Sequence, residues 1–406
     1  MTGGSLRPLA GRRIVALVAD AAARWRDADY PPRVQVTSAI EARLGYSAPV
    51  VEYALDRLFG GITERQLLAT IAAELGDVAA LDGVVERPGA PAAWARGVDR
   101  AVVISSDTTI GVALVPAIFA LCAKCCVVVK DRNDALVGAF FASLAQEHPA
   151  FAEAAAARAW TGGADAAEDA LLAAADVVVA FGGDDALHAI RGRCGIETRF
   201  VAFGHRASIG RLTAAGAAAL DGPQADAIVR DALLYDGEGC LSLHALFVEA
   251  AGDALARTAA ALAAACARIS LELPPGRLPP ERAAAAGAYR SLARFRAASG
   301  AGPALGGGAA TVVVHEAGDE PPPFLPGVLP LISIASDDDV AAYVATQRLP
   351  VQALGTIAPD ERDIALAARI GAVRVAPFGT LQDPPLGGHH GGAPRIADFV
   401  RWIDRE

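Results

Sequence analysis

The sequence predicts an α/β protein in which two parallel-sheet domains follow a helical N-terminal segment. Short runs of Val and Ile alternate with helical stretches along most of the chain, which is the pattern of buried parallel strands covered by helices. The alternation occurs twice, once before and once after a glycine-rich segment at Cys240. The length of 406 residues also favours two or three domains.

Residues 1–95 are expected to form the helical segment and to pack on the domain that follows. Apolar residues recur at helical spacing over 64–75, and Ser38 with Glu41 three residues later is typical of a capping box at a helix start. Pro88 and Pro91 mark the end of this segment.

Residues 96–235 and 236–385 are expected to form the two α/β domains, and 386–406 a C-terminal tail. Cys240 lies near the junction of the two domains along the chain, and ligand sites favour such places. Strands are expected over 101–105, 126–130, 176–181 and 199–203 in the first domain and over 243–248, 311–315, 331–334, 351–354 and 372–375 in the second; helices are expected over 112–123, 134–146 and 253–269.

The composition argues against two classes of partner. A formal net charge of −10 without a long basic run argues against a nucleic-acid surface. The N-terminus lacks the apolar core of a signal peptide, and charged residues interrupt the apolar run over 251–269, so we expect no membrane span and a cytoplasmic location. Most of the six cysteines lie among apolar residues, as reduced cysteines do, and the Cys122 and Cys125 pair lacks a second ligand pair for zinc.

Cys240 is the strongest candidate for a catalytic residue. Gly237 and Gly239 precede it, and glycines let the backbone turn sharply and leave space for a substrate to approach the sulfur. A thiolate in such a place suits covalent catalysis on an acyl carbon. The alternative is a buried structural cysteine in a turn before a strand.

Two strand ends are candidates for binding a nucleotide cofactor. Lys130 ends the strand over 126–130, and the carboxyl ends of parallel strands border the crevice in which open α/β sheets bind ligands. Gly182 and Gly183 end another strand where a helix begins, so backbone N–H groups there could receive a pyrophosphate. Asp184 or Asp185 is expected to cap that helix, although both carboxylates would oppose a phosphate. The GxGxxG fingerprint is missing, so a plain tight turn and a solvated lysine remain the alternatives.

These motifs occur in the order found in the aldehyde dehydrogenase superfamily, and the chain most resembles its long-chain acyl-CoA reductases, the LuxC family. The resemblance runs from the segment that contains Trp25 to the C-terminus. It rests on the strand that ends at Lys130, the glycine turn after Phe181, the segment 236–242 and the tail over 385–402. It implies an aldehyde dehydrogenase-like α/β fold with a cofactor domain and a catalytic domain.

The resemblance also implies roles for individual residues. Lys130 would contact the adenosine ribose of the cofactor, Gly182 and Gly183 would approach its phosphates, and Cys240 would be the nucleophile. The implied cofactor is NADPH, with NADH as the alternative, since Arg132 is either a partner of a 2′-phosphate or an exposed arginine.

The chain departs from the superfamily pattern at several places. Glu238 stands where a Gln is usual, and the region of the general-base Glu reads Ala-Phe-Gly-His-Arg over 202–206. A hydrolytic enzyme needs that base to activate water, whereas a reductase that takes acyl groups from a thiol does not. The oxyanion-hole Asn also lacks a counterpart, so the hydroxyl of Thr108 or Ser106 and the backbone N–H of Cys240 are the candidates for that role. The Glu that contacts the nicotinamide ribose is missing as well.

The histidines near these motifs have different expected roles. His205 lies where the general base would be and is a candidate proton relay, with a surface histidine as the alternative. His244 is expected to be structural, because positions four apart on a strand are separated by about 13 Å. His389 and His390 are expected in a turn at the active-site entrance, and no metal site is expected.

The expected function is the NADPH-dependent reduction of a long-chain acyl thioester, either acyl-CoA or acyl-protein, to the aldehyde through an acyl group on Cys240. The alternatives are an aldehyde dehydrogenase that acts on a small aldehyde or acyl phosphate, a Cys-dependent acyltransferase, and a non-catalytic subunit of an acyl-processing complex. The resemblance further implies an acyl-protein synthetase as a partner and a homo-oligomeric state.

Overall fold

The computed structural model describes residues 4–106, 108–131, 135–159, 166–299, 304–307, 309–316, 319 and 322–406. The chain divides into two compact units. The first comprises residues 1–44, 51–204 and 385–406, and the second comprises residues 45–50 and 205–384. The chain therefore passes from the first unit to the second at 204/205, whereas the boundary expected from the sequence is 235/236.

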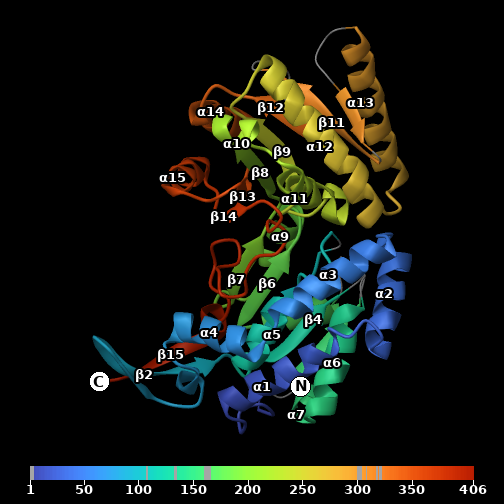
Figure 1. The fold of residues 1–406 in the computed structure, drawn as a ribbon. Helices are drawn as coiled ribbons and strands as arrows, with labels where there is room; N and C mark the ends of the chain where they lie inside the picture. Colours follow the sequence, from blue (N-terminus) through green and yellow to red (C-terminus); the bar gives the residue numbers. More distant parts are fainter. Residues whose placement is uncertain are drawn as a thin grey trace. The chain divides into compact units, whose positions relative to one another are not determined.

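Within the described residues, the first unit is built on a parallel sheet of five strands in the order β5-β4-β3-β6-β7 (Figure 1). The chain runs outward from β3 through β4 to β5 and returns to β6 on the other side of β3. This reversal is a topological switch point, where open α/β sheets bind ligands. The strands are β3 (Arg100–Ile104), β4 (Cys126–Lys130), β5 (Ala155–Arg158), β6 (Val177–Phe181) and β7 (Arg199–Phe203), and the helices between them are α5 (Leu114–Cys122), α6 (Leu136–Glu147), α7 (Ala150–Ala154), α8 (Ala166–Ala173) and α9 (Asp184–Arg191).

The expected helical N-terminal segment is present and packs within the first unit. Trp25, fully buried, stacks on Phe59 with 5.1 Å between ring centroids and donates from Nε1 to Ser143 Oγ at 3.1 Å. α1 contacts α5 and α6, and α2 contacts α6, so these helices cover part of the sheet layer. The helices of the segment are α1 (Gly11–Arg24), α2 (Pro31–Leu44), α3 (Ala48–Gly61) and α4 (Glu64–Leu75), followed by the 3₁₀ turn η1 (Val78–Leu81).

The expected capping box at Ser38 and Glu41 is wrong. Both residues lie inside α2, which begins at Pro31. Proline suits a first helical turn because its φ is already helical and the N–H that it lacks would have no partner within the helix. α4 does begin with a side-chain cap, since Thr63 accepts a hydrogen bond from the backbone N–H of Gln66 at 3.2 Å.

The C-terminal tail folds back onto the first unit and completes a small antiparallel sheet, β1-β2-β15, which was not predicted from the sequence. β15 (Val400–Arg405) lies beside β2 (Ala90–Gly97), which also pairs with β1 (Val85–Arg87) (Figure 1). Glu74 on α4 fixes the turn before β15, because its carboxylate accepts three backbone N–H groups at 2.7–2.9 Å. The donors are Arg395, Ile396 and Ala397, and Ala397 opens the 3₁₀ turn η3 (Ala397–Phe399).

The second unit carries, among its described residues, a sheet of seven strands in the order β10-β11-β12-β9-β8-β13-β14. All neighbours are parallel except β10 and β11. The strands are β8 (Ala207–Leu212), β9 (Leu243–Val248), β10 (Ala304–Gly307), β11 (Ala310–His315), β12 (Val328–Ser333), β13 (Val351–Thr356) and β14 (Val375–Pro377), and the helices are α10 (Ala214–Ala218), α11 (Gly222–Leu233), α12 (Gly252–Glu272), α13 (Pro280–Ala298), α14 (Asp337–Gln347) and α15 (Glu361–Ile370).

By length and composition alone, α12 is apolar enough to cross a membrane. Half of its most apolar window is buried inside the protein. It contacts α11, β10 and β11, and Cys266 and Ile269 on it are fully buried. These contacts are those of a core helix in the second unit.

Candidate active site

Cys240 lies in the loop at the amino end of β9. The loop follows α11 and the short 3₁₀ turn η2 (Leu234–Gly237). Tyr235, Asp236 and Gly237 have φ values of +56°, +54° and +76° in succession. Tyr and Asp rarely adopt positive φ, and such strain persists only where the surroundings hold the backbone in place.

One contact holds the strained part of this loop and another holds the residue after it. Asp236 Oδ1 accepts the backbone N–H of Gly276 at 3.0 Å, and Asp236 is buried. Glu238 accepts a hydrogen bond from Nε of Arg282 on α13 at 3.0 Å. The carboxylate that replaces the usual Gln therefore forms an ion pair with an arginine, which a neutral Gln could bind only through a hydrogen bond.

A second network holds the loop on both sides of the nucleophile. Ser242 Oγ accepts the N–H of Gly239 at 3.1 Å and receives a hydrogen bond from Gln382 Nε2 at 2.6 Å. Ser208, at the start of β8, donates from Oγ to the carbonyl oxygen of Cys240 at 2.9 Å. The backbone before, at and after Cys240 is thus tied to β8 and to the segment after β14.

The segment that supplies Gln382 is itself anchored by a buried carboxylate on α11. Asp231 accepts the backbone N–H groups of Gly379 at 2.6 Å and Leu381 at 3.2 Å. Burial raises the pKa of Asp231 to about 7, even though these N–H groups lower it. Its side chain therefore supports the segment that carries Gln382.

Cys240 itself is exposed, unlike a buried structural cysteine. Protein atoms nevertheless crowd the sulfur, so desolvation of the thiolate raises the pKa of Cys240 above its ordinary value. The backbone N–H groups of Cys240 and Leu241 and the positive charge of Arg206 lower this pKa in part. Arg206 is therefore the side chain that favours the thiolate, and no sequence motif marks it although it lies beside His205.

We expect Arg206→Gln to slow the alkylation of Cys240 several-fold at neutral pH. The thiolate is the reactive form, so the rate rises with pH through the pKa of the thiol. Removing the positive charge raises this pKa further and moves the rise to higher pH. Iodoacetamide labelling followed by intact mass, over a series of pH values, measures the shift. Arg257→Gln on the exposed face of α12 is the matched control, and an Arg206→Gln profile that coincides with it would contradict the assignment.

The two histidines near the loop differ in environment. His244, on β9, accepts the backbone N–H of Ser208 at Nδ1 at 3.3 Å, and its ring lies 5.0 Å from that of Phe324. Burial lowers the pKa of His244 to about 4, so the ring is neutral, as expected of a structural histidine. His205 is exposed just before β8 and contributes to lowering the pKa of His244, which places it close by. It remains a candidate proton relay.

The other sequence-predicted residues lie in the first unit, at the carboxyl edge of its sheet. Thr108 follows β3, Lys130 ends β4, and Gly182 and Gly183 follow β6; these three strands are neighbours on both sides of the switch point. The structure therefore brings these residues to one edge, the edge at which such sheets bind nucleotides.

The glycine turn fits a cofactor phosphate in shape. Gly183 is the N-cap residue of α9, its helix start has no side-chain cap, and a Cβ at Gly183 would meet nothing within 4 Å. Backbone N–H groups at such a helix start attract a phosphate. The expected cap by Asp184 or Asp185 is wrong, because both residues lie inside the first turn, where their carboxylates oppose an anion.

Lys130 is buried, which corrects the alternative of a solvated lysine. Its Nζ lies 2.9 Å from Oε1 of Glu168 on α8, and Glu168 is only 2% exposed. Oε2 of Glu168 lies 3.2 Å from Nη2 of Arg193, which follows α9. No local pattern marks Glu168 as a partner of Lys130, since the two residues lie far apart along the chain. Arg132, the predicted 2′-phosphate partner, lies outside the described residues.

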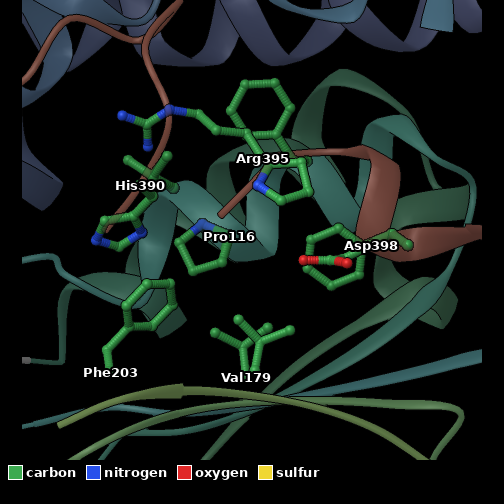
Figure 2. Close-up of a pocket in the computed structure, with 11 residues that line it drawn as sticks. Pro116, Val179, Phe203, His390, Arg395 and Asp398 are labelled. Carbon is green, nitrogen blue, oxygen red and sulfur yellow. The ribbon is translucent and has the colours of Figure 1, made fainter. Parts of the chain in front are cut away.

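A small apolar hollow opens in the first unit between α5, the sheet and the C-terminal tail (Figure 2). Pro116, Val179 and Phe203 form part of its wall, and Arg395 and Asp398 bring charge to it. The ring of His390, from the tail, stacks on Phe203 with 4.2 Å between centroids, and burial lowers the pKa of His390 to about 4. Of the residues singled out in the sequence, His390 lines this hollow, whereas Cys240, Lys130 and the glycine turn do not.

Two further features bear on the predicted chemistry. Among the residues that the structure describes, no group of three or more His, Cys, Asp or Glu side chains could hold a metal ion. Cys122 and Cys125, at the passage from α5 to β4, are fully buried, and burial raises the pKa of Cys122 to about 12. These thiols are inert core residues, in contrast to Cys240.

Comparisons with known proteins identify solved structures that share this fold. No curated protein sequence matches the chain significantly. Solved structures match across nearly all of it: a variant of proline utilization A from Bradyrhizobium japonicum has a TM-score of 0.71 at 18% identity over 98% of this chain. An NAD-dependent benzaldehyde dehydrogenase from Corynebacterium glutamicum has a TM-score of 0.70 at 13% identity, covering 99% of this chain and 88% of its own. The chain spans only 43% of the length of the first of these.

The fold predicted from the resemblance is confirmed, since the solved neighbours are aldehyde dehydrogenase-like and both units carry parallel-sheet α/β structure. The family model for acyl-CoA reductase (LuxC) matches residues 7–402. The match covers almost the whole chain, from before α1 into β15. This protein is therefore a member of the acyl-CoA reductase (LuxC) family, built on the aldehyde dehydrogenase fold.

Proposed function

We propose that the protein reduces a long-chain acyl thioester to the aldehyde with NADPH, through an acyl group held on Cys240. Membership of the acyl-CoA reductase family supports the reaction class. The observation that carries the assignment to Cys240 is its position: it is exposed, on a strained loop that hydrogen bonds fix before and after the sulfur. Strain of this kind is found where a fold presets the geometry of a functional group.

The first chemical step needs a thiolate and a fixed sulfur. Sγ of Cys240 attacks the carbonyl carbon of the thioester, a new C–S bond forms, and the bond to the donor thiol breaks, so the donor leaves as a thiolate. Ser208 and Ser242 keep the loop in position while Arg206 favours the charged form of Cys240. Backbone N–H groups at the loop and the hydroxyl of Thr108 are the proposed donors to the developing oxyanion.

The second step returns Cys240 to its starting state. When bound, the reduced nicotinamide would supply a hydride, which adds to the carbonyl carbon of the acyl thioester and leaves a tetrahedral thiohemiacetal anion on Cys240. The C–S bond to Cys240 then breaks, the aldehyde leaves, and the sulfur recovers its electron pair as a thiolate. The general-base Glu that would activate water is missing from the segment before β8, which favours reduction over hydrolysis of the acyl group.

Lys130, Gly182 and Gly183 are the proposed contacts for the cofactor, and His205 is the proposed proton relay. The donor is proposed to be acyl-CoA or an acylated protein; in the second case an acyl-protein synthetase is the proposed partner. We also propose a cytoplasmic homo-oligomer.

An assay with acyl-CoAs of graded chain length tests this function. We expect NADPH oxidation that increases with chain length, with one aldehyde formed for each NADPH consumed. Gas chromatography of the products identifies the aldehyde. Formation of acid from a small aldehyde without CoA would instead favour an aldehyde dehydrogenase, and acyl exchange without NADPH oxidation would favour an acyltransferase.

A further inference from the structure

We infer that Glu168 is a specificity-determining residue that disfavours a phosphate on the 2′ position of the cofactor ribose, against the attraction of Lys130 and Arg193. This inference rests on the proposed use of a nicotinamide cofactor at the carboxyl edge of the first sheet. It goes beyond that proposal because it assigns the choice between NADPH and NADH to a carboxylate on α8.

The cluster is built around one buried carboxylate that two cations share. Glu168 Oε1 lies 2.9 Å from Lys130 Nζ, and Oε2 lies 3.2 Å from Arg193 Nη2. Lys130 and Glu168 are both buried, whereas the side chain of Arg193 is 24% exposed. Arg193 also donates from Nε to Asp169, whose side chain is 53% exposed.

The cluster lies close to the edge of the first sheet at which the cofactor is proposed to bind. Lys130 is the last residue of β4, one strand from the switch point, and α8 leads into β6, the strand that ends in the glycine turn. In sheets of this topology, an acidic residue near a strand end accepts a hydrogen bond from the ribose 2′-hydroxyl, whereas an arginine accommodates a 2′-phosphate. The cluster contains one acidic group, Glu168, and one arginine, Arg193, beside Lys130.

The charge of each side chain in the cluster determines whether that side chain favours NADPH or NADH. Lys130 and Arg193 carry two positive charges, and Glu168 and Asp169 carry two negative charges, so the cluster is neutral as it stands. A buried carboxylate next to Lys130 repels a 2′-phosphate more strongly than an exposed one would, because solvent screens it less. A ribose with a free 2′-hydroxyl carries no charge there and can donate to the carboxylate.

The experiment measures the dissociation constants of NADPH and NADH by the fluorescence of the bound reduced nicotinamide, without substrate. We expect Glu168→Gln to raise the ratio Kd(NADH)/Kd(NADPH) about tenfold over wild type, since the shape is kept and one negative charge is lost. Arg193→Gln is expected to lower the same ratio about tenfold, because a cation near the 2′ position is lost. Asp169→Asn, which removes a charge that is 53% exposed and pairs with Nε of Arg193, is the matched control and is expected to change the ratio less than about threefold.

Thermal unfolding of each variant separates a folding defect from a change in specificity. Arg193 is partly exposed, so Arg193→Gln keeps the inference testable even where Glu168→Gln does not fold. Variants that bind both cofactors with the wild-type ratio would overturn the inference and leave the proposed function intact. A wild-type protein that binds neither NADPH nor NADH would overturn the proposed cofactor and with it this inference.

Discussion

Cys240→Ala is expected to reduce acyl-CoA-dependent NADPH oxidation by at least about a thousandfold, since removal of a catalytic nucleophile leaves only binding and electrostatic contributions. The side chain of Cys240 is exposed, and its loop is held by backbone and neighbouring side chains rather than by the sulfur itself. The variant should therefore fold and still bind the cofactor. Steady-state oxidation of NADPH with a long-chain acyl-CoA measures the loss.

Cys194→Ala is the matched control for this variant. Cys194 is the other cysteine with some solvent exposure, it follows α9, and its Sγ contacts the carbonyl oxygen of Ile190. We expect the control to retain activity close to that of wild type. Substantial NADPH oxidation by Cys240→Ala, with the control unchanged, would show that the sulfur is not the nucleophile.

Arg211→Ala is expected to lower the free energy of unfolding of the second unit by about 3–5 kcal/mol, the effect of leaving buried charges without their partner. Arg211 lies on β8 and its side chain is 1% exposed. It holds Asp363 at 2.8 Å, Asp337 at 2.6 Å and Glu249 at 3.3 Å. Without the guanidinium, these carboxylates repel one another in a poorly solvated place.

Arg362→Ala provides the comparison, because Arg362 pairs with the same Glu249 and Asp337 at 2.6 Å from the outside. Its side chain is 50% exposed, so its loss is expected to cost less than about 1 kcal/mol. Urea denaturation followed by circular dichroism gives both values. Equal losses for the two variants would mean that burial does not set the strength of this cluster.

Strands with a continuous apolar run were predictable from the sequence, and strands without one were not. β4, β7 and β9 have the bounds expected from their Val-, Phe- and Leu-rich runs. β8, by contrast, contains Ser208, Gly210 and Arg211, and the buried arginine is neutralised by carboxylates from other segments. β2 and β15 were missed because their pairing joins chain segments that lie hundreds of residues apart.

In the candidate site, too, the residues marked by a local motif were predictable, and their partners from distant segments were not. Local signals, a cysteine after glycines and a lysine at a strand end, selected Cys240 and Lys130. The partners that tune them, Glu168 for Lys130 and Gln382 for the nucleophile loop, come from distant segments whose sequences carry no local motif. Only the folded chain brings such residues together, so tertiary contacts and not local patterns identify them.

The most direct test of the central claim is the mass of the protein after mixing with a long-chain acyl-CoA in the absence of NADPH. We expect a stoichiometric adduct of one acyl group, located on the peptide that contains Cys240, which disappears on addition of NADPH as the aldehyde forms. An unmodified Cys240 in a protein that still produces aldehyde, or an adduct that NADPH leaves in place, would contradict the central claim.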